Sequence, residues 1–179
     1  MPETDLARAV RTIPDFPKPG VLFRDISPLL EDAVLFHQTI QLLAAECSDL
    51  HPSKIIGIDA RGFIFGAALA YKLGLGFVPV RKKGKLPSHT ISHAYDLEYG
   101  SAELEIHSDS IRAGEAVVIV DDLLATGGTA GAVLKLLDQI GAKALLALFV
   151  VELPDLGGRA SLAPCEVRSL MAFGDQVHS

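Results

Sequence analysis

Short apolar runs alternate along most of the chain with stretches whose apolar positions recur at helical spacing. The runs predict strands over residues 54–58, 77–80, 116–120 and 144–151. Helices are predicted over 62–73 and from about 129 to 140, closed by Gly74 and Gly141. Nearly continuous apolar strands that alternate with helices predict an α/β fold, with a mostly parallel central sheet flanked by helices. Residues 170–173 are a candidate for a last edge strand.

The first fifty residues follow a different pattern. Thr4 and Asp5 can begin a short helix that reaches about Ile13, and Pro14 then stops it. Prolines and a glycine over 14–20 predict an ordered loop, which leads into the extended residues 21–26. Asp32 is a candidate N-cap for a long amphipathic helix that ends near Leu50.

A basic stretch, residues 81–93, interrupts the strand–helix alternation. Its polar residues include Arg81, Lys82, Lys83, Lys85, His89 and His93, and it has few apolar ones. A loop of this length inside a compact domain is typical of a lid or a disordered segment. The two histidines are interpreted as polar loop residues. Residues 94–97 and 102–106 then predict a hairpin around 98–101.

Composition and charge fit one domain over residues 1–179, because 49% of the residues are hydrophobic and can form a sizeable core. The net charge of −6 argues against a sequence-independent grip on nucleic acid, which needs clustered Lys and Arg. It leaves room for a small anionic substrate, because backbone N–H groups and a few cationic side chains can hold phosphates locally.

Nothing in the sequence indicates a membrane partner or an oxidising compartment. Cys47 and Cys165 lack the spacing of metal or redox motifs, and we interpret them as reduced, largely buried thiols. The first thirty residues show no signal-peptide core, and the longest apolar run, 144–151, is too short to span a bilayer. We therefore expect a cytoplasmic protein.

The strongest motif is residues 117–129, VVIVDDLLATGGT. It reads as an apolar strand, two adjacent carboxylates, and a loop of small residues that opens a helix. Asp121 and Asp122 at a strand's carboxyl end can accept hydrogen bonds from ribose hydroxyls or bind Mg²⁺. The loop's N–H groups and the helix dipole can hold a phosphate. The alternative is that the acids only cap a helix and the glycines only make a turn.

As a whole, this motif resembles the phosphoribosyl pyrophosphate-binding motif of the type I phosphoribosyltransferases. Further blocks that resemble the adenine-specific members follow in the family's order over nearly the whole chain: FPKPGVLFRDISP (16–28), DARGF (59–63), RKKGKLP (81–87) and YDLEYG (95–100). Asp121 and Asp122 favour the adenine enzymes, because the hypoxanthine and orotate enzymes usually carry a Glu-Asp pair there.

The resemblance implies the type I phosphoribosyltransferase fold and its activity. The expected parts are a small hood that binds the base, about residues 1–31, and a flexible catalytic loop and hairpin, about 81–107. The implied reaction joins adenine to phosphoribosyl pyrophosphate in purine salvage, giving AMP and pyrophosphate with the help of Mg²⁺. A homodimer, with no nucleic-acid or membrane partner, is expected.

The phosphate and sugar contacts are expected on two loops and the basic stretch. The ribose 5-phosphate would be bound by Asp121, Asp122, Ala125, Thr126, Gly127, Gly128 and Thr129, and Asp121 and Asp122 would hold the metal, directly or through water. Pyrophosphate would be bound by Ala60, Arg61, Arg81, Lys82 and Lys85. A cation such as Arg61 at a helix start opposes the helix dipole, which favours an anion nearby. The resemblance also implies a cis peptide before Arg61.

Catalysis and base recognition are expected from the hairpin and the hood. Glu98 would face N7 of adenine and handle its proton, with Arg61 and Tyr99 as the other catalytic residues. The alternative for Glu98 is a turn carboxylate that faces water. Adenine would be bound by Leu22, Phe23, Arg24, Ala125 and Glu98, largely through backbone near Leu22. Phe23 can stack on adenine or belong to the core.

Two other functions remain open from sequence. The same chemistry could act on a 6-oxo purine, which needs a donor near O6. The sequence offers no clear candidate for this donor and leaves only Lys18 and Lys143 open. A non-catalytic regulator would keep the loop at 121–129 but could lose the lid and the acid. Arg61, Arg81 and Glu98, and the lack of a basic extra domain, favour the enzyme.

Overall fold

A seven-stranded sheet organises the part of the chain that the computed structural model describes, residues 3–97 and 100–174. Its order is β5-β6-β4-β3-β7-β8-β9. The strands are β3 (Lys54–Ile58), β4 (Gly76–Lys82), β5 (Thr90–Leu97), β6 (Gly100–His107), β7 (Ala116–Leu124), β8 (Lys143–Glu152) and β9 (Val167–Ala172). β4, β3, β7, β8 and β9 run parallel, and the hairpin β5–β6 joins antiparallel to β4. The predicted mostly parallel sheet and edge strand are confirmed.

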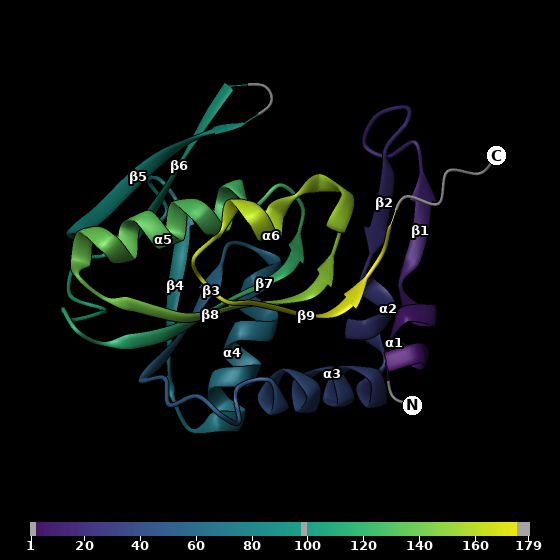
Figure 1. The fold of residues 1–179 in the computed structure, drawn as a ribbon, viewed down its shortest axis with the longest axis horizontal. Coiled ribbons are helices and arrows are strands. Elements are labelled where there is room, and N and C mark those ends of the chain that lie inside the picture. The colour runs from purple at the N-terminus through teal and green to yellow at the C-terminus, as the bar shows by residue number, and fades with distance from the viewer. Residues whose placement is uncertain (1–2, 98–99, 175–179) are drawn as a thin grey trace.

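Helices cover both faces of the sheet (Figure 1). α3 (Ala33–Ala45) and α4 (Arg61–Leu73) lie on one face, and α5 (Gly128–Ile140) and α6 (Gly158–Ser161) lie on the other. Successive strand side chains point to opposite faces, so Ile55 packs in the core on the α4 side and Ile56 in the core on the α5 side. This double burial explains why the parallel strands are almost continuously apolar.

The predicted helix signals are largely confirmed. Asp32 caps α3, its Oδ1 accepting the N–H of Val34 at 2.8 Å and of Leu35 at 3.0 Å. α3 ends at Ala45, earlier than the expected Leu50, and residues 46–50 continue as tight turns that seat Cys47 in the core. Burial raises the pKa of the Cys47 thiol to about 11. No helix in the described ranges is long and apolar enough to cross a membrane.

A small hood stands beside the β9 edge of the sheet (Figure 1). It consists of α1 (Glu3–Ala9), β1 (Arg11–Pro14), β2 (Leu22–Asp25) and α2 (Ser27–Glu31). The prediction of one helix to Ile13 is wrong, because the chain leaves α1 after Ala9 and pairs antiparallel with β2. Thr12 and Ile13 are β-branched residues that suit a strand. The 310 helix η1 (Pro154–Leu156) precedes α6.

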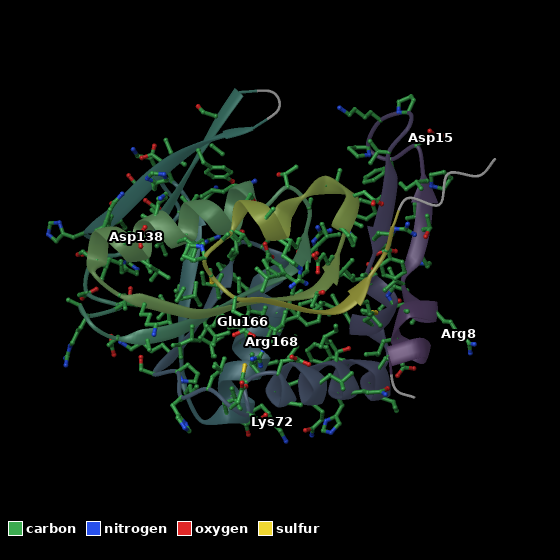
Figure 2. All side chains as sticks on the ribbon, in the orientation of Figure 1. Arg8, Asp15, Lys72, Asp138, Glu166 and Arg168 are labelled. Carbon is green, nitrogen blue, oxygen red and sulfur yellow. The ribbon has the colours of Figure 1, made fainter. Side chains whose placement is uncertain are left out.

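Side-chain contacts hold these outer parts in place (Figure 2). Asp15, in the loop between β1 and β2, accepts the N–H of Gly20 on its Oδ1 at 2.8 Å. Arg168 of β9 contacts Glu166 through Nε at 2.8 Å and Asp49 through Nη1 at 2.9 Å. The edge strand is thereby tied to the turns that follow α3.

Candidate active site

The carboxyl ends of the two central strands, β3 and β7, lie at the topological switch point of the sheet. The chain passes from β3 through α4 to β4 on one side, and from β7 through α5 to β8 on the other. In open α/β sheets, ligands bind in the crevice outside the carboxyl ends of such strands. Arg61 follows β3, and Asp121 and Asp122 lie near the end of β7, so the chain order brings the predicted sugar and pyrophosphate residues to one edge.

Asp121 and Asp122 are part of β7 rather than of the turn after it. The sequence predicted that this strand ends at Val120. That is where its pairing with β3 stops, because Val120 and Gly57 are the last paired residues. On the other side β8 continues to pair with β7 as far as Leu124. The two acids therefore sit on rigid strand backbone while their edge toward β3 is open.

Arg61 connects three parts of this edge. Its Nε lies 2.7 Å from Oδ2 of Asp122, and its guanidinium carbon lies 5.6 Å from the ring centroid of Phe23 in the hood. The Asp122 side chain is 7% exposed, whereas that of Arg61 is 45% exposed. The nearly buried acid thus fixes an arginine that a ligand can still reach. The predicted cis peptide lies one bond earlier, between Asp59 and Ala60.

Burial makes it costly for both acids of the pair to be ionised together. Burial and the neighbouring charge of Asp122 raise the pKa of Asp121 well above its usual value. Burial also raises the pKa of Asp122, although the Arg61 charge opposes this shift. Asp121 Oδ1 accepts the N–H of Asp122 at 2.9 Å. A partner that donates hydrogen bonds or brings positive charge would favour the ionised forms.

A hollow of about 80 Å³ follows the acids and is lined mainly by residues 121–130. We call residues 125–129 the phosphate loop. Gly127 has a φ of 84°, which favours glycine, and α5 begins at the next residue. No side chain in the described ranges caps this helix start, so its first N–H groups can bind an anion. Ala125, Thr126, Gly128 and Thr129 all line the hollow.

A second cavity of about 350 Å³ lies under the hood and is lined by Phe16, Phe23, Asp25 and Arg61, among others. Phe16 meets Phe23 edge-on, with 5.1 Å between the ring centroids. Phe23 and Asp25 share one face of β2, so Leu22 and Arg24 are not among the lining residues.

Arg24 instead steadies the hood from outside the cavity. It donates to the Thr12 hydroxyl and lies over the ring of Phe173 at 4.8 Å. Sequence reasoning did not single out Ile13, Phe16 or Asp25, which also line the cavity. The alternation of side chains along 21–26 is the signal that could have found Asp25 once Phe23 was chosen.

The basic stretch is more ordered than its composition predicts. β4 runs to Lys82 and β5 begins at Thr90, so only residues 83–89 connect the strands, and the expected loop over 81–93 is wrong in extent. Arg81 turns to the exit of β3, where its Nε lies 3.0 Å from Oδ2 of Asp59. This ion pair ties Arg81 to the segment that continues into Ala60 and Arg61. Lys82 is exposed, as is Lys85.

Glu105 of β6 organises this connection. It is only 3% exposed, and its Oε1 accepts the backbone N–H of Lys85 at 2.9 Å and of Leu86 at 2.8 Å. Lys83 pairs with Glu103, with Nζ 2.6 Å from Oε1. Two acids of one strand therefore hold the basic turn against the hairpin, a role that sequence reasoning did not assign to them.

The hairpin lies across α5 and reaches the phosphate loop (Figure 1). The Tyr95 hydroxyl is 3.4 Å from Oγ1 of Thr129, and Nδ1 of His93 is 3.4 Å from Nε2 of Gln139. His89 belongs to the turn before β5. Glu98 and Tyr99 lie outside the described residues, so their predicted roles stay predictions. Lys143 begins β8 at the opposite end of the strands, which removes it as a donor to the base.

Comparison with known proteins agrees with this geometry. A model of the phosphoribosyl transferase domain matches residues 30–156. An adenine phosphoribosyltransferase of Carboxydothermus hydrogenoformans is 54% identical over 169 residues, which cover 94% of this chain and 99% of the relative. The chain belongs to the adenine phosphoribosyltransferase family. Its members are pentosyltransferases of purine salvage, as the resemblance predicted.

Solved structures of adenine phosphoribosyltransferases share the fold. That of Thermoanaerobacter pseudethanolicus is 48% identical with a TM-score of 0.93, and 96% of this chain covers 99% of that one. That of Saccharomyces cerevisiae, solved with adenine and an imino-altritol bisphosphate, is 41% identical with a TM-score of 0.89, over 94% of this chain and 98% of that one. The predicted type I fold is thereby confirmed.

Proposed function

We propose that this chain transfers the 5-phosphoribosyl group of phosphoribosyl pyrophosphate to N9 of adenine, giving AMP and pyrophosphate. The contact of Arg61 with both Asp122 and Phe23 carries the proposal. That one side chain joins the loop after β3, the acids of β7 and the cavity under the hood. The arrangement suits a substrate whose pyrophosphate, sugar and incoming base must meet at one carbon atom.

The leaving group would be bound by the loop after β3, the end of β4 and the connection at residues 83–89. The transition state resembles an oxocarbenium ion, with negative charge growing on pyrophosphate, so catalysis needs cations placed in advance. Arg61 begins α4 and Arg81 lies near the end of β4, and each is held by an acid. With Ala60, Lys82 and Lys85 they would surround the pyrophosphate oxygens and orient it.

The sugar phosphate would span the acids and the phosphate loop. Asp121 and Asp122 would accept hydrogen bonds from the ribose hydroxyls, which would relieve the burial of their charges. Residues 125–129 would hold the 5-phosphate through N–H groups at the start of α5. Because the acids and the phosphate loop lie on rigid backbone, binding the ribose hydroxyls and the 5-phosphate together would fix the position of the anomeric carbon relative to the base.

Mg²⁺ fits this site as a companion of pyrophosphate rather than as a resident ion. No group of three or more His, Cys, Asp or Glu side chains in the described ranges could hold a metal. The donor set is one pair of carboxylates, Asp121 and Asp122, of which Asp122 already contacts Arg61. Mg²⁺ is commonly held by one or two carboxylates, waters and substrate phosphates, and when bound it would neutralise the departing pyrophosphate.

Adenine would occupy the cavity under the hood against Phe23, with backbone near Leu22 and Ala125 beside the ring. Arg24 would keep the hood in place from its contacts with Thr12 and Phe173. By resemblance, Glu98 would hold or supply the proton at N7, and Tyr99 would cover the reacting centre. The relative from Giardia lamblia was solved with 9-deazaadenine, which supports a purine as a ligand of this chain.

A cytoplasmic homodimer is part of the same proposal. Ile64, Ala67 and Tyr71 are exposed along one face of α4, and Tyr71 is 90% exposed. An apolar stripe of this kind on a helix suits burial against a second copy. Light scattering after size-exclusion chromatography tests it, and a monomer at micromolar concentration would contradict it.

One assay tests the activity and its specificity. The protein is mixed with phosphoribosyl pyrophosphate, Mg²⁺ and either adenine or hypoxanthine, and the nucleotides are separated by chromatography. AMP from adenine, with little product from hypoxanthine, is expected. Product from hypoxanthine alone would establish the 6-oxo purine alternative, and binding of phosphoribosyl pyrophosphate without any product would establish a regulator.

A further inference from the structure

A short helix behind the phosphate loop takes no part in the roles assigned above. α6 packs against the loop through Ser161, which is not among the residues that line the hollow. The Ser161 hydroxyl lies 2.8 Å from the carbonyl oxygen of Thr126 and 2.8 Å from that of Gly158, so it shares its proton between them.

The packing between α6 and the phosphate loop is very close. A Cβ atom on Gly127 would lie 2.2 Å from Ser161 Oγ, and one on Gly158 would lie 2.2 Å from the carbonyl oxygen of Ala125. Both distances are far below any real contact, so only glycines at these two positions allow α6 and the loop to pack this closely. The position of α6 therefore determines the position of the loop.

The contact between Ser161 and the Thr126 carbonyl also orients the N–H group of Gly127, because both groups belong to one peptide. The C=O and N–H groups of one trans peptide point in opposite directions. Because the Thr126 carbonyl points to Ser161, the N–H of Gly127 points away from that hydroxyl, and Gly127 itself lines the hollow. Without the hydroxyl, this peptide has lost the side-chain partner that holds its plane, while Gly127 can adopt other conformations at little cost.

α6 is itself anchored to the sheet at a buried acid. Glu152 at the end of β8 is 5% exposed, and its Oε1 accepts Nε of Arg159 at 3.0 Å. Nη2 of Arg159 contacts Oε2 of the same carboxylate, and Nη1 donates to the carbonyl of Val167. Ser169 adds a hydrogen bond to Glu152 at 2.7 Å. These bonds connect β8 and β9 to the helix that carries Ser161.

We propose that Ser161 is a positioning residue for the ribose 5-phosphate group, and that its hydroxyl sets the peptide between Thr126 and Gly127 so that the Gly127 N–H faces the phosphate. The inference rests on the proposed function, because it deepens the assignment of the phosphate loop. Arg159 and Glu152 hold α6 at the distance that this bond needs.

The test compares Ser161→Ala with Ser161→Thr, which keeps the hydroxyl. Ser53→Ala is the matched control, because Ser53 is also an exposed serine that donates to a carbonyl, that of Ala116 at 3.0 Å, at the opposite end of the strands. KM for phosphoribosyl pyrophosphate, KM for adenine and kcat are measured for each. Titration calorimetry with ribose 5-phosphate gives binding without catalysis.

Loss of one such hydrogen bond should weaken ribose 5-phosphate binding and raise KM for phosphoribosyl pyrophosphate about three- to tenfold in Ser161→Ala. KM for adenine, and both values in Ser53→Ala, should stay within about twofold of wild type. Ser161→Thr should lie nearer wild type than Ser161→Ala.

The proposal is overturned if Ser161→Ala binds ribose 5-phosphate as wild type does, if it raises both KM values alike, or if Ser161→Thr behaves as Ser161→Ala. Failure of the proposed function is a separate result. In that case, the wild-type protein itself would make no AMP, whatever the variants bind.

Discussion

Arg61 Nε lies 2.7 Å from Oδ2 of Asp122, so a residue at the start of α4 is paired with one near the end of β7. The two are far apart in sequence and come from different βα units. Their pairing fixes the relative position of the pyrophosphate loop and the sugar-binding acids before any substrate arrives. Such preorganisation is what a reaction with a charged leaving group requires.

Replacing Arg61 with lysine should separate its charge from its geometry. A lysine keeps the positive charge, but it lacks the planar fork that can contact Asp122 and a phosphate together. We expect kcat/KM for phosphoribosyl pyrophosphate to fall roughly 10- to 100-fold in Arg61→Lys, as for loss of a charged hydrogen bond. Circular dichroism should be unchanged. A variant within twofold of wild type would mean that a point charge is sufficient there.

Phe23 should matter for adenine and much less for the sugar phosphate. Its ring lines the cavity under the hood and lies edge-on to Phe16. Stacking of a base on an aromatic ring is worth enough to raise KM for adenine about tenfold when Phe23 is replaced by alanine. Initial rates at varied adenine and phosphoribosyl pyrophosphate measure both constants. Equal increases in the two would show that Phe23 only supports the hood.

The sequence predicted the sheet and the position of the acids well, because these depend on local patterns. Apolar runs give the buried strands, Asp32 and Gly74 mark helix ends, and Asp121 and Asp122 follow the apolar run 116–120. It did not predict that β7 continues through the acids. That extension depends on pairing with β8, a neighbour that no local pattern specifies.

The errors share a cause, which is tertiary contact that overrides local propensity. Residues 81–93 looked like a long lid from their charge, but Glu105 binds the turn from twenty positions away in the chain. Residues 11–13 were predicted as the end of a helix, but together with Pro14 they pair with β2. Ser161 carried no sequence signal, because its role depends on the contact of α6 with the phosphate loop.

Gly62 should tolerate no side chain. A Cβ there would lie 2.8 Å from Asp121 Oδ1 and 2.8 Å from the carbonyl oxygen of Val120. Gly62→Ala must therefore push the start of α4 away from β7, which would move Arg61 from Asp122. We expect a fall in Tm and at least a tenfold loss of kcat/KM, since overpacking of this kind costs about 1–3 kcal/mol.

Gly76→Ala is the matched control for Gly62→Ala. Its nearest neighbour would be Lys54 Cγ at 3.6 Å, an ordinary contact, so Tm and kcat/KM should hardly change. If the two alanine variants behaved alike, close packing at Gly62 would not be what sets the distance between α4 and β7.

Glu105 should make stability depend on pH in the acid range. Burial alone would raise its pKa, but the backbone N–H groups of Gly84, Lys85 and Leu86 outweigh burial and hold the pKa below its ordinary value of 4.5. A carboxyl whose pKa is lower in the folded state stabilises the fold fully above the unfolded value. This contribution is lost as the pH falls through the lower, folded pKa.

Glu105→Gln measures that contribution. The variant should have a lower Tm than wild type near pH 6, and the difference should shrink below about pH 4, where the wild-type carboxyl becomes neutral as well. Differential scanning fluorimetry over this range provides the two curves. A Tm difference that is the same at every pH would show that the charge of Glu105 is irrelevant to the turn.

Glu98→Gln should slow the chemical step without weakening the nucleotide complex. Glu98 lies outside the described residues, and its role rests on the resemblance of residues 95–100 to the adenine enzymes. A group that handles a proton in the transition state affects kcat and kcat/KM together, and leaves ground-state binding largely unchanged. We expect kcat to fall about 100-fold, as for loss of general acid–base catalysis, while Kd for AMP changes less than about threefold.

Glu115→Gln, at the opposite end of β7, is the control and should keep wild-type kcat. If Glu98→Gln instead raised KM for adenine at constant kcat, Glu98 would be a binding residue and the proton would be handled elsewhere.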